Sequence, residues 1–201
     1  MGTMFLVSLY VASELIANIT ASKPISLFGI VAPGGVLIYA LTFTLIDLIN
    51  ERMGKREATT VVYAAFSANV LLAFYSTLII ALPFPPFFTG QDAFMSVLGS
   101  TPRIVTASLS AYLLSTLIDV QIFSWWKLHV GRHKWFRVLA SNAVSTGIDS
   151  VAFVTIAFWG ILPLVPLIAG QYLIKMVVTV MSIPLIYTIG AGKEFNSETR
   201  R

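Results

Sequence analysis

Six strongly apolar segments, each about the length needed to cross a lipid bilayer, dominate this sequence. A membrane-spanning helix needs roughly 20 mostly apolar residues. The composition agrees, since 57% of the 201 residues are hydrophobic and 11% are charged. We therefore predict an all-α membrane protein, built as a bundle of six transmembrane helices. The predicted spans are residues 3–22, 33–50, 59–82, 103–126, 138–162 and 167–190.

Most connections between these segments are short, and the one long loop is rich in proline. This loop covers residues 83–102, and its prolines break helical structure at both ends. In its middle we expect a short interfacial helix over residues 91–98. No linker divides the chain, so residues 1–201 are predicted to form a single six-helix transmembrane domain. The first apolar segment has no basic leader, so we expect a retained helix and not a signal peptide.

Positive charges predict the orientation, because cytoplasmic loops of membrane proteins carry an excess of Lys and Arg. Basic residues gather in the second and fourth connections and in the tail, whereas Lys23 and Arg103 lie on the opposite side. Both termini are therefore predicted to be cytoplasmic, in a multi-pass protein of the cytoplasmic membrane. The net charge of +4 comes from these loops, so we expect the lipid bilayer as the surroundings and no nucleic acid as a partner.

Charged residues inside the predicted spans are the unusual feature of this chain. Such a side chain costs about 2.5 to 3.5 kcal/mol at the centre of a membrane helix on insertion scales, so it usually faces a partner or a cavity. Asp149 lies deepest, and Lys175 is the obvious countercharge on the next span. A pair of this kind can be purely structural or can border a central cavity. The charged residues concerned are Glu14, Asp47, Asp119, Asp149 and Lys175.

Three of these aspartates end a similar motif, TLID or TGID. Asp47 and Asp119 lie close to basic cytoplasmic loops, where a loop-anchoring or topological role is at least as good an interpretation as substrate contact. Asp149 lies near the middle of its span, where snorkelling to the membrane surface cannot solvate it. Asp149 is therefore the first candidate for a ligand carboxylate.

Helical spacing places other polar side chains beside these charges, since residues three or four apart share a face. Four spans each present such a face to the predicted interior, and Arg103 opens one of them. Serine and threonine in membrane helices mostly serve close packing, so amides and charges are the stronger candidates. The faces contain Glu14 and Asn18; Ser108, Tyr112, Ser115 and Asp119; Asn142, Ser145, Thr146 and Asp149; and Gln171, Lys175 and Ser182.

Motifs for catalysis or metal binding are weak in this sequence. The chain has no cysteine, and it contains no Walker lysine motif, GxSxG elbow or HExxH pair. His129 and His133 are four residues apart but lack a third ligand nearby, so we expect no metal. The double glycine at residues 34–35 is interpreted as the start of a helix. Intramembrane aspartates can serve proteolysis, but the flanking signatures are missing, so we expect neither an enzyme nor a cofactor.

Four stretches of the chain look like a known family. They are APGGVLIYALTFTLIDLINERMGKREA, DAFMSVLGSTPRIVTASLSAYLLSTLIDVQIF, STGIDSVAFVTIAFWG and QYLIKMVVTVMSIPLIY. Together they resemble the queuosine-precursor transporter family, also called the vitamin-uptake transporters, over nearly the whole chain. The resemblance implies a six-helix membrane protein that imports 7-deazaguanine bases such as preQ0, preQ1 or queuine, the precursors of the modified tRNA bases queuosine and archaeosine.

The resemblance also implies a site. A 7-deazaguanine presents adjacent N–H and NH2 donors on one edge, which a single carboxylate can accept in bidentate fashion. Asp149 is the first candidate for this role. An aromatic wall could come from Tyr112, Phe153, Trp159 or Tyr172, although such rings more often serve ordinary packing. The predicted substrate-binding residues are Asp149, Lys175, Asn18, Asn142, Thr146, Gln171, Asp119, Arg103, Glu14 and Tyr112.

Two positions depart from the family's pattern. Thr146 stands where the family tends to carry an amide, and Gln171 stands where it often carries an acid. These changes leave the transport class intact and the exact base open.

The favoured function is a transporter that exposes a deazapurine alternately to each side of the membrane. The alternative is a substrate-capturing membrane subunit of an ATP-driven vitamin importer, since such subunits also have six short helices. For this alternative, Ala17 and Ala21 could form a surface on which the motor docks. The sequence leaves open the energy source and whether the chain forms a homodimer.

Overall fold

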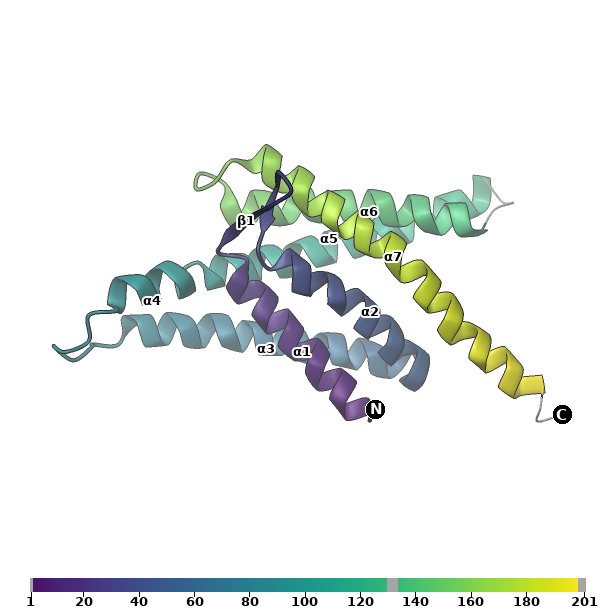
Figure 1. The fold of residues 1–201 in the computed structure, drawn as a ribbon, viewed down its shortest axis with the longest axis horizontal. Helices are drawn as coiled ribbons and strands as arrows, with labels where there is room; N and C mark the ends of the chain where they lie inside the picture. Colours follow the sequence, from purple (N-terminus) through teal and green to yellow (C-terminus); the bar gives the residue numbers. More distant parts are fainter. Residues whose placement is uncertain (1, 130–133, 199–201) are drawn as a thin grey trace.

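The protein is almost entirely helical in the computed structural model, which describes residues 2–129 and 134–198 (Figure 1). Within these ranges, the side chains of residues 47, 51, 116, 117, 119–142 and 182–198 are not described. Each predicted span overlaps one long helix, and the short helix predicted at residues 91–98 is confirmed. The elements are α1 (Thr3–Thr20), β1 (Pro24–Leu27), β2 (Ile30–Pro33), α2 (Val36–Met53), α3 (Lys55–Ala81), α4 (Gln91–Leu98), α5 (Thr101–His129), α6 (Lys134–Phe158) and α7 (Leu164–Glu198).

Several of these helices have the length and apolar composition of membrane spans. Among the described residues, three helical stretches are long and apolar enough to cross a bilayer, namely Thr3–Thr20, Lys55–Ala81 and Leu164–Met181. Two shorter apolar helical stretches accompany them, Val36–Asn50 and Ala143–Phe158. The helices therefore fit a membrane protein, as predicted.

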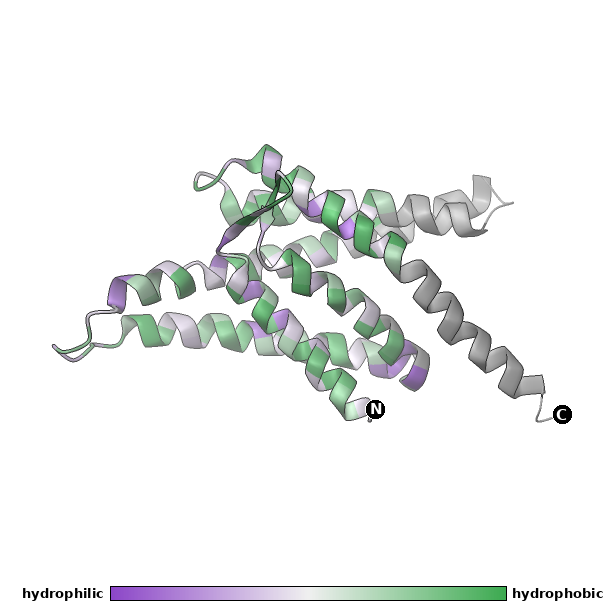
Figure 2. Cartoon of the chain, viewed as in Figure 1, coloured by the Kyte–Doolittle hydropathy of each residue, from purple (hydrophilic) through white to green (hydrophobic). Residues whose placement is uncertain are grey.

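Many large apolar side chains lie on the outer surface of the helices. Large apolar side chains point outward along the helices, among them Leu71 and Phe74 on α3 and Val177 on α7, which are 64%, 66% and 57% exposed. Polar side chains such as Asn69 and Gln171 are buried instead. Figure 2 shows green, apolar residues along the helices and purple, hydrophilic residues at the α2–α3 turn and at the start of α4. An apolar outer surface is what lipid tails require.

The hairpin of β1 and β2 was not predicted. Its strands pair antiparallel, with Leu27 opposite Ile30, and the two residues between them, Phe28 and Gly29, both have positive φ. Two-residue hairpin turns of this kind favour Asn-Gly or Asp-Gly, so the Phe-Gly pair carried no hairpin signal. In the part of the chain that the structure describes, this hairpin is the only β-structure, and it connects α1 to α2.

Two glycines allow backbone contacts that hold the hairpin and α2 in place. A Cβ atom on Gly170 of α7 would lie 1.9 Å from the carbonyl oxygen of Val31, in β2. One on Gly35, which immediately precedes α2, would lie 2.1 Å from the carbonyl oxygen of Ala17, in α1. A side chain at either position would force these elements apart. The prediction that the double glycine starts a helix is confirmed, because α2 begins at Val36.

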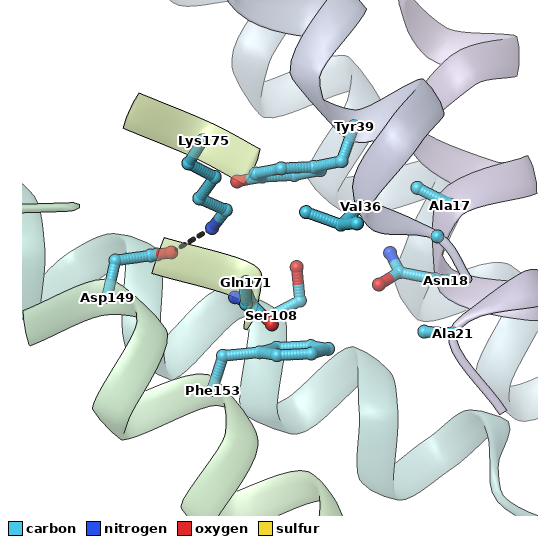
Figure 3. A pocket seen from close by; sticks show the side chains of 11 residues that line it. Ala17, Asn18, Ala21, Val36, Tyr39, Ser108, Asp149, Phe153, Gln171 and Lys175 are labelled. Carbon is cyan, nitrogen blue, oxygen red and sulfur yellow. Dashed lines mark hydrogen bonds and ion pairs between the residues drawn. The ribbon is translucent and has the colours of Figure 1, made fainter. Parts of the chain in front are cut away.

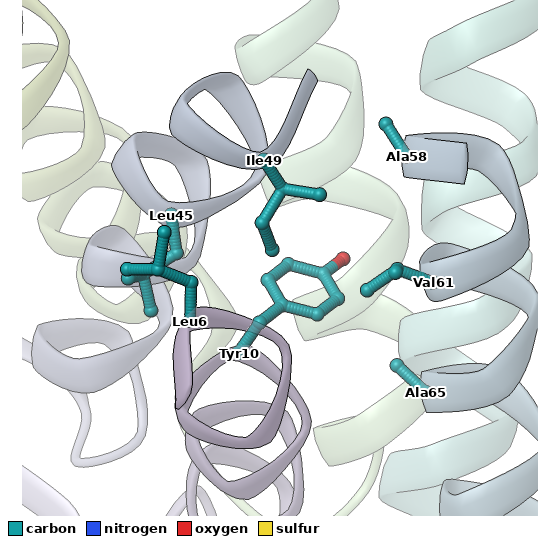
Figure 4. Packing of buried hydrophobic residues seen from close by; sticks show 7 residues of the cluster. All are labelled: Leu6, Tyr10, Leu45, Ile49, Ala58, Val61 and Ala65. Carbon is teal, nitrogen blue, oxygen red and sulfur yellow. The ribbon is translucent and has the colours of Figure 1, made fainter. Parts of the chain in front are cut away.

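Among the described side chains, buried apolar residues pack in two clusters. The first joins α1, α2 and α3, where Tyr10 and Ile49 meet Val61 (Figure 4). The second joins α5, α6 and α7, where Ile104 and Val154 are fully buried, together with Ala21 just after α1. Burial of Ala21 in the second cluster, and of Ala17 beneath Gly35, means that neither alanine is available as an exposed docking surface.

Candidate functional site

Asp149 and Lys175 form a buried ion pair between α6 and α7. The Lys175 ammonium donates a hydrogen bond to Oδ2 of Asp149, and the two side chains are 4% and 13% exposed, lysine first. This contact confirms the predicted pairing. Separation of such a pair in a low-dielectric interior is costly, since each ion alone lacks water to solvate it. The pair therefore keeps two charges inside the helix bundle.

The ring of Tyr39 completes the surroundings of Lys175. The Lys175 Nζ atom lies 4.7 Å from the centroid of this ring (Figure 3), which comes from α2. A cation over an aromatic face is stabilised by the ring quadrupole. Tyr39 was missing from the predicted site because nothing marks it among the apolar residues of its helix.

A pocket opens beside the ion pair. The space inside it and at its open mouth together amounts to about 360 Å³. Tyr39 and Phe153 form opposite walls, with their rings facing the space between them (Figure 3). The lining residues are Ala17, Asn18, Ala21, Gly35, Val36, Tyr39, Ser108, Asp149, Phe153, Gln171 and Lys175.

Two amide side chains line the pocket along with the ion pair. Asn18 on α1 is 4% exposed, and its Nδ2 atom donates a 2.7 Å hydrogen bond to Oδ1 of Asn69 on α3. Gln171 on α7 is 3% exposed, and its Oε1 atom is buried without a hydrogen-bond partner. A buried acceptor without a partner costs about 1 to 3 kcal/mol. The pocket wall therefore contains an acceptor that no residue of the described part of the chain satisfies.

The structure brings four of the ten predicted substrate-binding residues together at this pocket: Asp149, Lys175, Asn18 and Gln171. Glu14 is buried close by, hydrogen-bonded with Thr42 and in electrostatic contact with Lys175, but it does not line the pocket.

Arg103, Tyr112 and Thr146 lie elsewhere. The Arg103 guanidinium donates hydrogen bonds of 2.7 Å to the carbonyl oxygens of Ile156 and Trp159, at the end of α6. Tyr112 packs edge to face on Phe66. The backbone oxygen of Thr146 accepts a hydrogen bond from Ser150. None of the three is among the lining residues.

Other predicted positions lie outside the described side chains. These are Asp119 and Asn142 from the predicted site, Asp47 from the first TLID motif, and the pair His129 and His133.

Comparisons with known proteins agree with this arrangement. Residues 33–189 match the family described as "Putative vitamin uptake transporter". The chain is 31% identical over 176 residues to the "Probable queuosine precursor transporter" of Bacillus subtilis (strain 168), which covers 85% of this chain and 77% of that protein. It is 27% identical over 143 residues to the "Queuosine precursor transporter" of Escherichia coli (strain K12), which covers 71% of this chain and 62% of that protein. No solved structure matches it.

A match of this extent identifies a membrane transporter and not an enzyme, in agreement with the apolar helices and the buried polar pocket. The chain belongs to the vitamin uptake transporter family, the family that its sequence resembles.

Proposed function

We propose that this protein imports queuosine precursors, 7-deazaguanine bases, across the cytoplasmic membrane. The observation that carries the proposal is the pocket between the rings of Tyr39 and Phe153, with the Asp149–Lys175 pair at one end (Figure 3). The names of the two relatives point to the same substrates.

The shape of the pocket suits a flat ring. Aromatic side chains on opposite walls can stack on both faces of a planar base. Stacking on aromatic side chains contributes about 1 to 3 kcal/mol per base in other proteins. A flat heterocycle therefore gains more from this pocket than a flexible or saturated molecule of the same volume.

The ion pair matches the edge of a guanine-like ring. This edge carries a carbonyl oxygen next to an N–H and an NH2 group. The Asp149 carboxylate can accept from the two donors, and the adjacent Lys175 ammonium can donate to the carbonyl. The buried charges would then each keep a charge-assisted hydrogen bond when the base replaces their mutual contact.

A binding experiment tests this assignment. We expect Asp149→Asn and Lys175→Met each to weaken binding of 7-deazaguanine to the purified protein at least tenfold, which corresponds to about 1.4 kcal/mol. Asp92→Asn and Lys23→Gln are matched controls, because both side chains are exposed outside the pocket; they should leave the affinity unchanged. Calorimetric titration measures all four, and unchanged affinity in both pocket variants would contradict the assignment.

Reconstitution separates the two modes of transport. The purified chain alone in liposomes should take up labelled base. If uptake needs a separate ATPase module, the chain is a substrate-capturing subunit of an ATP-driven importer instead. The burial of Ala17 and Ala21 argues against the docking surface considered for such a motor.

The proposed topology has six spans, formed by α1, α2, α3, α5, α6 and α7, with both termini in the cytoplasm. It is supported by the basic residues of the α2–α3 turn and by the arrangement in Figure 1, where this turn and the start of α1 lie at one end, opposite the hairpin and α4. The chain has no cysteine, so Asp92→Cys and Lys55→Cys each introduce a single thiol. A membrane-impermeant thiol reagent should label position 92 in intact cells and position 55 only after permeabilisation, and the reverse pattern would refute the orientation.

A further inference from the structure

We propose that Asn69, a residue outside the pocket, fixes the amide of Asn18 so that the pocket accepts a ring N–H group and rejects an isosteric ring acceptor. Asn69 would then be a positioning residue for substrate specificity. The inference rests on the proposed function, since it requires a flat base between Tyr39 and Phe153.

Asn69 is held in one orientation by a backbone group. It is 1% exposed in the middle of α3, and its side chain makes a 3.0 Å hydrogen bond to the carbonyl oxygen of Ala65. A carbonyl oxygen only accepts hydrogen bonds, so the group of Asn69 that faces it must be the NH2. The oxygen of Asn69 is therefore directed away from Ala65.

The orientation of the Asn69 amide in turn determines the orientation of the Asn18 amide. The Oδ1 atom of Asn69 lies 2.7 Å from the Asn18 amide, and it can pair only with a donor. The NH2 group of Asn18 must therefore face α3. Rotation of the Asn18 amide by half a turn would bring two oxygens together in a buried site, where an unsatisfied acceptor costs about 1 to 3 kcal/mol. The oxygen of Asn18 is thus left for the pocket that Asn18 lines.

The position of Asn18 shows which part of a base it would meet. Figure 3 shows Asn18 on the side of the pocket opposite the Asp149–Lys175 pair. A guanine-like base bound with its amino edge at that pair points its five-membered ring toward Asn18. In 7-deazaguanine this ring carries an N–H donor, which suits the Asn18 oxygen.

Gln171 gives the pocket the same preference. Its buried Oε1 atom has no hydrogen-bond partner among the described side chains, so it too would accept from a donor. A ligand rich in N–H groups can donate to the side-chain oxygens of both Asn18 and Gln171. A ligand that presents acceptors leaves both oxygens unpaired, and its own acceptors are repelled by them. A polar site of this kind discriminates strongly against a ligand that lacks the donor, because its acceptors are then left unpaired. An apolar pocket discriminates less.

A ligand pair tests the inference. The two ligands are 7-deazaguanine and its furan-fused isostere, in which an oxygen atom replaces the N–H of the five-membered ring without a change in shape. We expect the wild-type protein to bind the N–H ligand at least tenfold more tightly in calorimetric titration. Asn69→Leu, which is similar in size but cannot orient Asn18, should reduce this preference to less than threefold.

Two controls separate orientation from general damage. Asn69→Asp keeps an acceptor for the Asn18 amide and should retain the preference. Ser76→Ala alters another buried polar residue of α3 and should also retain it. Where Asn69→Leu does not fold, Asn69→Ala takes its place with the same expectation.

The outcomes distinguish the inference from the proposed function. Equal wild-type affinity for both ligands overturns the inference and leaves the proposed function intact. A preference that survives Asn69→Leu or Asn69→Ala also overturns it. If the wild-type protein binds neither ligand, the proposed function fails and the inference fails with it.

Discussion

Removal of one member of the Asp149–Lys175 pair should destabilise the protein strongly, whereas removal of both should not. The side chains of Lys175 and Asp149 are only 4% and 13% exposed, so a charge that loses its partner is poorly solvated. Loss of one partner of a buried ion pair costs about 3 to 5 kcal/mol. We expect this loss of unfolding free energy in both Asp149→Asn and Lys175→Met.

The double variant is the informative one. Asp149→Asn combined with Lys175→Met removes both charges of the pair, and neutral replacement of a whole buried pair is often close to neutral for stability. The unfolding free energy of the double variant should therefore fall by less than half the sum of the two single losses. The difference is the coupling energy of a double-mutant cycle.

Thermal unfolding of the detergent-solubilised protein measures these effects. For a chain of this length, 1 kcal/mol corresponds to about 2 to 4 °C in Tm, so each single variant should unfold about 6 to 20 °C below the wild type. Single variants with the wild-type Tm would show that the charges are solvated and not buried. Additive losses in the double variant would show that the two residues do not interact.

Three further predictions concern residues around the site. Gly170→Ala should lower the Tm, because its Cβ would lie 1.9 Å from the Val31 oxygen, whereas Gly147→Ala, whose nearest neighbour would be at 3.6 Å, should change it little. Arg103→Met should lower the Tm by loss of two charge-assisted hydrogen bonds, about 1.5 to 3 kcal/mol each, and leave the affinity for 7-deazaguanine within twofold in titration. Tyr39→Leu should weaken that affinity about fivefold or more through lost stacking, and Tyr39→Phe should largely retain it.

The helices were predictable because an apolar run of sufficient length has few alternatives to a membrane helix. The pairing of Asp149 with Lys175 was predictable for a related reason, since two opposite charges deep in neighbouring spans need each other. The hairpin at residues 24–33 was not predictable, because its strands are four residues long and its turn lacks the usual residues.

The rest of the site depends on contacts between helices that spacing along one helix cannot reveal. Arg103 was expected at the substrate, but it pairs with the last carbonyls of α6. Tyr39 looks like any other aromatic residue of an apolar helix. Asn69 could have been noticed, because an amide in the middle of a membrane span usually has a partner. Asp119 and Asn142 stay predictions.

In the proposed orientation, the contact between the hairpin and α7 would let a molecule outside the cell act on the pocket. Gly170 lies against the backbone of β2, and the next residue, Gln171, lines the pocket. Phe28 at the tip of the same hairpin is fully exposed. In the proposed orientation, an antibody fragment could bind this tip from outside the cell. The bound fragment would restrain the pocket wall formed by α7, and so slow the exchange of substrate without entering the pocket. With the proposed function and orientation, the hairpin would be an accessible epitope for inhibitors of uptake.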